Sequence, residues 1–229
     1  IGTVERPFLE STQEGDAYLR EALGTRHAKE YRRLWRRLAE QGKLTYTVSR
    51  TEDDIRARLE DFLAVEASGW KGQRGSAMAV DRFRAAFARE AVNNLAGRDL
   101  ARIHTLELDG RTIAVLVVFV EAGQAWTWKT AYDESLAAYS PGVLLMIEML
   151  KNHLDDPNID RTDSCAVPDH PVASRLFQER ESIGTLVIGL TPASDRAARQ
   201  AASQIHLYRR TQNIARIVRE RLRGLTGRK

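Results

Sequence analysis

The sequence predicts an α/β fold with a mixed sheet, antiparallel at its centre, and helices on both faces. Three observations lead to this prediction. Apolar residues recur with helical spacing in some stretches and alternate as in strands in others. Three consecutive strands joined by short turns are followed by a strand–helix–strand step, which makes the sheet mixed. The 229 residues are 43% hydrophobic, enough to bury a sizeable core, and this composition excludes a mainly disordered chain.

The first part of the chain is predicted to be mostly helical. Residues 1–15, with Pro7 and Gly15, suggest an irregular segment. A helix is expected over 16–41 because apolar residues recur at steps of three and four, and Gly42 is placed to end it. Residues 44–48 alternate as in a strand.

Two further helices are expected before the central strands. Thr51 and the three acids after it begin a helix that runs to Ser68, because acids favour the positive end of a helix dipole. A loop over 69–75, which holds three glycines, leads to a helix over 81–95. The apolar face expected for that second helix consists of Phe83, Phe87, Ala91 and Leu95.

The second half begins with three strands, over 100–108, 111–120 and 124–132. Asp109-Gly110 is a two-residue hairpin turn, and the middle strand is apolar along its centre, so both of its faces should be buried. The remaining expected elements are a loop over 133–140, a helix over 141–154, a strand over 159–163, a short helix over 171–178, a strand over 183–190 and a long helix over 194–222.

Charge divides the chain into three parts. Residues 194–229 carry +8 and residues 26–43 carry +5, whereas 44–193 carry −6 and 1–25 carry −3, which gives the net +4. We therefore predict an N-terminal segment with a basic helix over 1–42, a domain over 43–192 and a basic helix over 193–229. A solvated face explains the basic helices best, and nucleic acid, an anionic membrane face or an acidic partner remain alternatives.

Several classes are excluded by what the sequence lacks. The longest purely apolar run, residues 113–120, is far shorter than the roughly 20 residues of a bilayer-spanning helix. Cys165 is the only cysteine, so no intrachain disulfide can form, and a cytoplasmic location is expected. The five histidines show no metal-ligand spacing, and no metal is expected. The chain starts at Ile1, which suggests that an upstream domain is missing.

The strongest local signal is the segment from Tyr139 to Leu144, which joins a strand region to a helix. Pro141 suits the first helical turn, Ser140 is a plausible N-cap, and Gly142 leaves the backbone amides open. A helix start with free amides binds phosphate well. An ordinary capped helix start explains the same residues.

Four strings of residues resemble those of one enzyme superfamily. They are residues 62–72 (FLAVEASGWKG), 125–134 (AWTWKTAYDE), 139–145 (YSPGVLL) and 163–171 (DSCAVPDHP). In this order they resemble the GNAT superfamily of N-acyltransferases, and in detail its cellulose-biosynthesis (CelD-like) branch, which is related to the Fem-type aminoacyltransferases.

The resemblance implies an acyl-CoA site, with acetyl-CoA as cosubstrate and no metal. The strand before the phosphate-binding helix would hold the pantetheine arm and the thioester oxygen, through Trp128, Lys129 and Thr130. The helix start would hold the pyrophosphate. The residues expected at that start are Tyr139, Ser140, Gly142 and Val143. The superfamily's loop usually begins with Gln or Arg, where this chain has Tyr139, so its cradle lacks that arginine.

Candidate general bases lie at predicted strand ends or in the turns after them. They are Asp133, Asp163, Asp169 and His170. His170 is attractive because the ordinary pKa of histidine is about 6.5. It could equally cap the short helix that follows, and Asp163 could hold a loop. Cys165 as a covalent nucleophile is a minor alternative, because a lone cysteine is more often a small buried apolar residue.

The acceptor side is predicted around Trp70 and Lys71, where an exposed indole beside Lys and Arg suits a sugar or an anionic acceptor. Packing of Trp70 on the core is an equal alternative. Trp126 and Trp128 should share one strand face, with Lys129 on the other. At least one of the two indoles should pack on the sheet.

These observations predict an acyl-CoA-dependent N-acetyltransferase acting on a small-molecule amine, such as an amino sugar or polysaccharide precursor. Two alternatives remain open. One is Fem-type aminoacyl transfer, in which the basic helices would bind charged tRNA. The other is a catalytically silent fold that binds a partner.

Overall fold

The computed structural model describes residues 3–208 and 211. Residues 6–180 form one compact unit, and the described parts of 1–5 and 181–229 form a second. The strands make a seven-stranded mixed sheet in the order β2-β3-β4-β5-β6-β1-β7. The predicted fold class is therefore confirmed.

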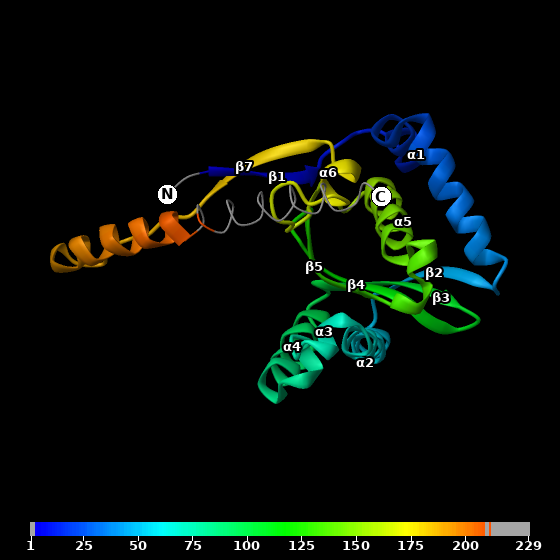
Figure 1. Ribbon diagram of the computed structural model, residues 1–229, viewed down its shortest axis with the longest axis horizontal. Coiled ribbons are helices and arrows are strands. Elements are labelled where there is room, and N and C mark those ends of the chain that lie inside the picture. The colour runs from blue at the N-terminus through cyan, green and yellow to red at the C-terminus, as the bar shows by residue number, and fades with distance from the viewer. Residues whose placement is uncertain (1–2, 209–210, 212–229) are drawn as a thin grey trace, which may run out of the picture. The chain divides into compact units, whose positions relative to one another are not determined.

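The helices of the first unit lie on both faces of the sheet (Figure 1). Helices α1 (Gly15–Ala39) and α5 (Pro141–Asp155) cover one face, with α6 (Ala173–Leu176) beside α1. Helices α2 (Glu52–Ser68) and α4 (Arg82–Ala96) cover the other face, with the short α3 (Trp70–Gln73) after α2. Each layer has its own apolar core against the sheet.

The centre of the sheet is antiparallel, as expected. Strands β2 (Leu44–Ser49), β3 (Ala101–Leu108), β4 (Arg111–Glu121) and β5 (Gln124–Tyr132) pair in succession. Residues 113–118 of β4 are all buried, which confirms that both faces of this strand are covered. Strand β6 (Arg161–Asp163) pairs with β5 in parallel, which completes the strand–helix–strand step.

The N-terminal residues differ from the prediction of an irregular segment. Thr3–Leu9 form β1, which pairs antiparallel with β6 so that Phe8 lies opposite Asp163. Pro7 and two neighbouring charges weaken the strand pattern in the sequence, yet Pro7 and Leu9 are buried. A strand from the start of the chain thus takes the place beside β6.

The last predicted strand, 183–190, is shifted. The observed strand β7 is Glu179–Gly184, and Leu186, Ile188 and Leu190 are exposed. Its sheet neighbour β1 begins at Thr3, whose side chain lies near Gly184, so the ladder ends there. Residues 195–208 are helical, and the rest of the predicted basic helix, with Arg209, Arg210, Arg216, Arg219, Arg221 and Arg223, lies outside the described residues except for Thr211.

Helix α4 presents a different face from the one predicted. Ala85, Ala88, Val92 and Ala96 are buried, whereas Phe83 and Phe87 are 71% and 59% exposed. Small side chains allow α4 to approach α2 closely, and the two phenylalanines lie outside this contact.

Two segments predicted as loops contain short helices. They are the glycine-rich loop, which contains α3, and the loop over 133–140, which contains the 3-10 helix η2 at Glu134–Tyr139. A further 3-10 turn lies at Met78–Val80, between that first loop and α4. Among the described residues, no helix is both long and apolar enough to cross a bilayer.

Candidate active site

The site lies where β5 and β6 separate. The last pair between the two strands is Trp126 with Asp163, and β5 continues alone on that side to Tyr132. After Asp163 the chain turns away through Cys165, whose φ is 47°. The Thr127 hydroxyl donates to the Ser164 carbonyl at 2.5 Å and fixes the point of divergence. The edge of β5 beyond Trp126 therefore faces a gap between the two strands.

A β-bulge lies on this free part of β5. Val117 of β4 pairs with Lys129, but Val118 pairs with Thr127, so Trp128 is the extra residue. The bulge reverses the alternation of faces, because Ala125 packs in the α5 layer whereas Ala131 packs in the α2 layer. Lys129 was predicted to lie on the other strand face from Trp128 because side chains alternate along a regular strand. The bulge interrupts this alternation at Trp128, so that reasoning does not apply here.

The indole of Trp128 packs on the sheet. It contacts the rings of Phe119 and Phe87 at centroid distances of 5.5 and 6.5 Å. This is the packing role expected for at least one of the two strand tryptophans. The side chain of Trp128 thus packs against the α4 layer. A ligand at this position would therefore contact the backbone of Trp128.

The start of α5 lies beside the end of β5. Ser140 has a left-handed backbone (φ 53°, ψ 50°) and its side chain makes no cap, so the predicted N-cap hydrogen bond is absent. Its carbonyl accepts from the amides of Val143 and Leu144 at 3.0 and 3.1 Å. Pro141 has no N–H, and the amide of Gly142 has no partner in the described part of the chain. One amide is thus open in the first turn.

Gly142 is also close to β5. A Cβ at this position would lie 3.1 Å from the Tyr132 ring. The guanidinium of Arg37, on α1, lies 5.4 Å from the centre of the Tyr139 ring in the preceding loop. The structure thus brings a cation to the loop whose sequence lacks the usual arginine. The sequence predicted a solvated face for the basic helix that carries Arg37, because nothing local links Arg37 to Tyr139.

A charged cluster joins the loop after α2 to the same strand. Lys71 Nζ lies 2.9 Å from Glu66 Oε1 and 3.3 Å from the Thr130 carbonyl oxygen. The Glu66 side chain is 1% exposed, and its other oxygen accepts from the Met78 amide at 2.8 Å. Lys71, predicted for the acceptor, therefore contacts Thr130, predicted for the cofactor. Sequence reasoning missed Glu66, although it follows Phe62 and Leu63 at helical spacing.

Trp70 lies on the solvent side of this cluster. Its side chain is 47% exposed, and the Arg74 guanidinium lies 5.1 Å from the indole centre. Its amide donates to Glu134 Oε1 at 2.9 Å, which ties α3 to the loop after β5. The exposed indole agrees with a contact surface for an acceptor and disagrees with packing on the core.

The predicted bases are not equivalent. Asp133 accepts from the amide and hydroxyl of Ser135, and these hydrogen bonds, helped by Arg111 at 2.9 Å, hold the pKa of Asp133 below its usual value. Asp133 is thus committed to capping η2 as a carboxylate. Asp169 lies on an exposed turn with a φ of 58°.

His170 lies on the same exposed turn and caps the short helix α6. Its Nδ1 accepts from the Ala173 amide at 3.2 Å. A neutral imidazole that accepts at Nδ1 carries its proton on Nε2. The capping alternative is therefore the role that the hydrogen bonds support.

Asp163 is the candidate nearest to the divergence. Its carboxylate accepts from Arg6 Nη1 at 3.2 Å and from the Cys165 amide at 2.7 Å, and its side chain is 8% exposed. Partial burial, with the charge of Asp163, raises the pKa of the Cys165 thiol to about 11. A thiol with that pKa is a weak nucleophile near neutral pH.

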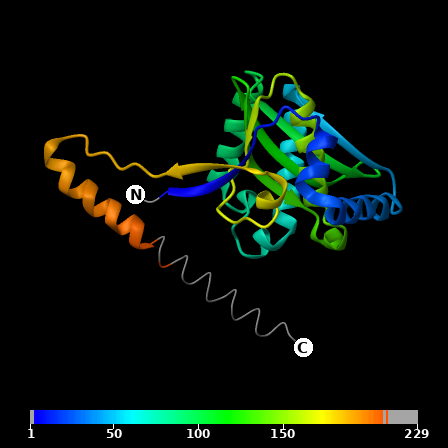
Figure 2. The ribbon, with the colours of Figure 1, turned by 90° about the horizontal axis from the view of Figure 1, so that it is seen from above.

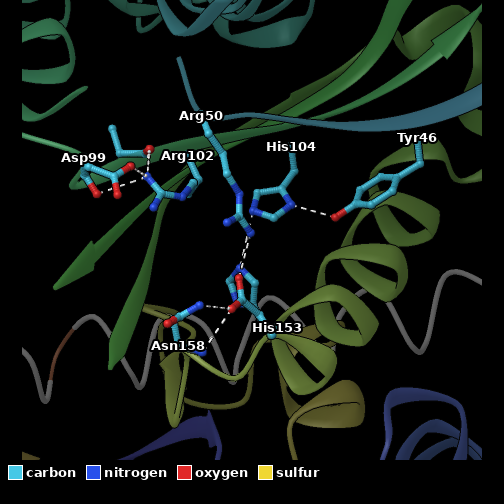
Figure 3. A network of polar contacts seen from close by, with 9 residues as sticks. Tyr46, Arg50, Asp99, Arg102, His104, His153 and Asn158 are labelled. Carbon is cyan, nitrogen blue, oxygen red and sulfur yellow. Dashed lines mark hydrogen bonds and ion pairs between the residues drawn. The ribbon is translucent and has the colours of Figure 1, made fainter. Parts of the chain in front are cut away.

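Two buried histidines lie between α5 and the sheet, His153 on α5 and His104 on β3. Figure 3 shows His104 between Tyr46 and His153. The Tyr46 hydroxyl lies 2.7 Å from His104 Nδ1, the two Nε2 atoms are 3.3 Å apart, and His153 Nδ1 lies 2.8 Å from the Thr162 hydroxyl. In the described part of the chain, no three His, Cys, Asp or Glu residues gather as metal ligands.

Comparison with known proteins identifies the family. Residues 25–166 match the family described as an acetyltransferase (GNAT) domain. No curated protein matches the chain.

Three solved structures illustrate the likeness. The C-terminal domain of a putative lysylphosphatidylglycerol synthetase from Agrobacterium fabrum is 17% identical, with a TM-score of 0.50, over 77% of this chain and 51% of that one. An aminoglycoside acetyltransferase from an uncultured soil metagenomic sample, in complex with trehalose, is 12% identical (TM-score 0.46; 65% and 97%). An N-acetyltransferase from Thermoplasma acidophilum, in complex with coenzyme A, is 15% identical (TM-score 0.35; 47% and 73%).

The chain spans about half the length of the first two structures that it matches, at 51% and 50%. The family match covers well over half of this chain, and the mixed sheet with its gap between β5 and β6 agrees with it. The chain therefore belongs to the GNAT acetyltransferase-domain family.

Proposed function

We propose that this chain is an acyl-CoA-dependent N-acyltransferase that transfers an acetyl group from acetyl-CoA to an amine. The observation that carries the proposal is the free edge of β5 with its bulge at Trp128, next to the open first turn of α5. A free strand edge suits the amides of a pantetheine arm, and a helix start suits a pyrophosphate.

In the proposed reaction, the acceptor nitrogen attacks the thioester carbonyl, the carbon–sulfur bond breaks and releases coenzyme A as its thiolate, and the nitrogen loses a proton. Backbone amides around Trp128 to Thr130 are proposed to stabilise the oxygen as it gains negative charge. Gly142 N–H would hold a phosphate oxygen, and Arg37 lies within reach of the same loop. We assign proton uptake to Asp163, because it lies at the divergence of the strands.

The acceptor is proposed to bind over Trp70 and Lys71. An exposed indole with Arg74 beside it suits the apolar face of a sugar ring, and the surrounding charges suit its polar groups. An amino sugar or a polysaccharide precursor is therefore the proposed acceptor class. This choice agrees with the cellulose-biosynthesis-type branch that the sequence strings resemble.

Calorimetric titration with acetyl-CoA tests the proposal, with coenzyme A and ATP as comparison ligands. We expect acetyl-CoA and coenzyme A, which share the pantetheine arm, to bind, and ATP, which lacks it, to bind at least tenfold more weakly. Gly142→Glu should weaken acetyl-CoA binding at least tenfold because its carboxylate repels the pyrophosphate. Gly142→Gln is the matched control, because it crowds Tyr132 equally and adds no charge. Equal losses in both variants, or no binding by the native chain, would contradict the phosphate site.

Aminoacyl transfer from tRNA is the alternative that the arginines of α1 suggest. Of the six arginines of α1, Arg33 pairs with Glu30 at 2.7 Å and Arg37 lies over Tyr139, so these two already have other contacts. Binding of tRNA that weakens steeply with salt, in a chain that does not bind acetyl-CoA, would favour this alternative. Binding of neither ligand would favour a silent partner-binding fold.

A further inference from the structure

A groove of about 550 Å³ lies between α1 and α5, and neither His104 nor His153 lines it. The two helices run antiparallel here, since Asp16 near the start of α1 contacts Lys151 near the end of α5. On α5 the groove extends from Leu144 to Lys151, a rise of about 10 Å. Nothing in the proposed acyl transfer uses this space.

A bend in α1 shapes the groove. Gly24 has φ 62° and ψ 169°, a combination that is almost confined to glycine. The two segments of α1 run in different directions on either side of it (Figure 2). No atom lies within 4 Å of a Cβ built at Gly24, so the backbone conformation, and not crowding, requires the glycine. Leu23 before the bend and Trp35 after it both line the groove.

The floor of the groove is apolar. Leu19 and Leu23 from α1 and Leu144 and Ile147 from α5 belong to the core cluster on this face, and Trp35 packs against it. These four side chains are buried, and the partly buried Tyr31 and Trp35 supply the apolar surface that a ligand with an apolar part would cover.

The charges at the rim leave a positive excess. Lys151 Nζ lies 3.1 Å from Asp16 Oδ1 and 3.3 Å from Glu148 Oε1, so these three charges form one network with a net charge of −1. Arg20 has no ion-pair partner among the described residues, and Arg32 donates only to the Ala28 carbonyl, at 3.2 Å. When the guanidinium groups of Arg20 and Arg32 are added to this network, the net charge at the rim is +1.

We propose that this groove binds a single-chain anionic amphiphile. The chain would lie along the apolar floor beside Trp35 and Ile147, and the anionic head would bind Arg20 and Arg32. Guanidinium groups make strong, often paired hydrogen bonds to carboxylate and phosphate oxygens, which accounts for the choice of an anion. The site is separate from the β5 edge and does not depend on acyl-CoA binding.

Titration of the full chain with three probes, below micelle-forming concentrations, tests the proposal. The probes are decanoate, acetate with the same head and no long chain, and decyltrimethylammonium with the same chain length and a positive head. We expect saturable one-to-one binding of decanoate, at least tenfold tighter than either comparison probe. Equal binding of the cationic probe would show apolar contact without an anion site and overturn the proposal, as would the absence of decanoate binding.

Variants then locate the site. The double variant Arg20→Ala/Arg32→Ala should weaken decanoate binding at least fivefold. Arg36→Ala is the matched control, because Arg36 is exposed on the same helix and does not line the groove. Gly142→Glu should leave decanoate binding unchanged, which separates this site from the acyl-CoA site. Unchanged binding in the double variant, or an equal loss in Arg36→Ala, would place the anion elsewhere and overturn the proposal.

Discussion

The imidazoles of His104 and His153 face each other with their Nε2 atoms 3.3 Å apart, and both rings are buried. Only one of these nitrogens can carry the shared proton. The hydrogen bonds then run either from Tyr46 through both rings to Thr162 or from Thr162 to Tyr46. In both cases each ring donates with one nitrogen and accepts with the other. The pair joins β3 to α5 and holds α5 on the sheet in a neutral form.

This arrangement predicts loss of stability in mild acid. Burial lowers the pKa of His153 to about 4; the charge of Asp156 opposes this shift and that of Arg50 adds to it. Burial also lowers the pKa of His104 well below 6.5. The unfolded chain therefore binds more protons below pH 6.5, so stability is complete above that pH and falls as the pH drops towards 4. For His153 alone the full loss is about 3 kcal/mol.

Urea unfolding at pH 7.5, 6.5, 5.5 and 5.0 measures this effect. His27→Gln, which removes an exposed histidine, should keep the same pH dependence. His153→Gln should be less stable at pH 7.5 and show a shallower fall with acid. A free energy of unfolding that stays constant from pH 7.5 to 5.0 would contradict the prediction.

Asp163→Asn tests the proposed proton acceptor. The amide keeps an oxygen for the Cys165 amide but loses the charge, so the kcat of acetyl transfer should fall at least tenfold while acetyl-CoA affinity stays within twofold. Asp133→Asn is the control, because Asp133 caps η2, and its kcat should change little. A larger loss of kcat in Asp133→Asn would move the proton acceptor to that residue.

Cys165→Ala should retain most of the activity. The raised pKa of the thiol, about 11, leaves little thiolate at neutral pH, and direct transfer needs no nucleophile on the protein. Steady-state rates and intact-mass spectrometry after mixing with acetyl-CoA are the measurements. An acetylated Cys165 that forms and decays at the rate of turnover would favour a two-step mechanism instead.

Glu66 and Lys71 should behave as a coupled pair. Lys71→Met leaves the buried Glu66 carboxylate with only the Met78 amide, and should cost about 3 kcal/mol of unfolding free energy. The double variant Glu66→Met/Lys71→Met should be more stable than Lys71→Met alone, because no buried charge is left unpaired. Additive losses in the double-mutant cycle would show that the two side chains do not interact.

Deleting residues 210–229 should leave acetyl-CoA affinity within twofold of the native chain. Every residue proposed to contact the cofactor lies within the compact unit of residues 6–180. Calorimetry of the truncated chain measures this, with circular dichroism as the check on folding. Loss of binding in a folded truncated chain would assign a role in the site to the deleted arginines.

Much of the fold follows from local sequence patterns. The run from Ile113 to Val118 has no polar face, so burial on both sides was predictable, and Asp109-Gly110 fixed the hairpin between β3 and β4. Strand β1 was not predictable, because its pairing with β6 depends on contacts far along the chain and Pro7 masks its pattern. The face of α4 was predicted wrongly, because hydrophobicity favoured Phe83 and Phe87 whereas close packing on α2 favoured alanines.

The candidate site was predictable in part. The strings around Trp128 and Gly142 pointed to β5 and to the start of α5, whose backbone follows from local sequence. The free edge of β5 was not predictable, because it depends on where β6 turns away. The contacts of Arg37 with Tyr139 and of His104 with His153 join residues about 50 or more positions apart. The spacing of residues along the sequence does not predict contacts between residues so far apart.

The position of β1 beside β6 also has a kinetic consequence. Phe8 must pair with Asp163, 155 positions later, and at about 5–20 residues per second β1 leaves the ribosome about 8–30 s before its partner. Until then its edges are open to pairing with other nascent chains. Glu5, Arg6 and Pro7 lie in the middle of this strand, and charged side chains and proline discourage such pairing. The residues that hide β1 in the sequence thus protect it from aggregation during synthesis.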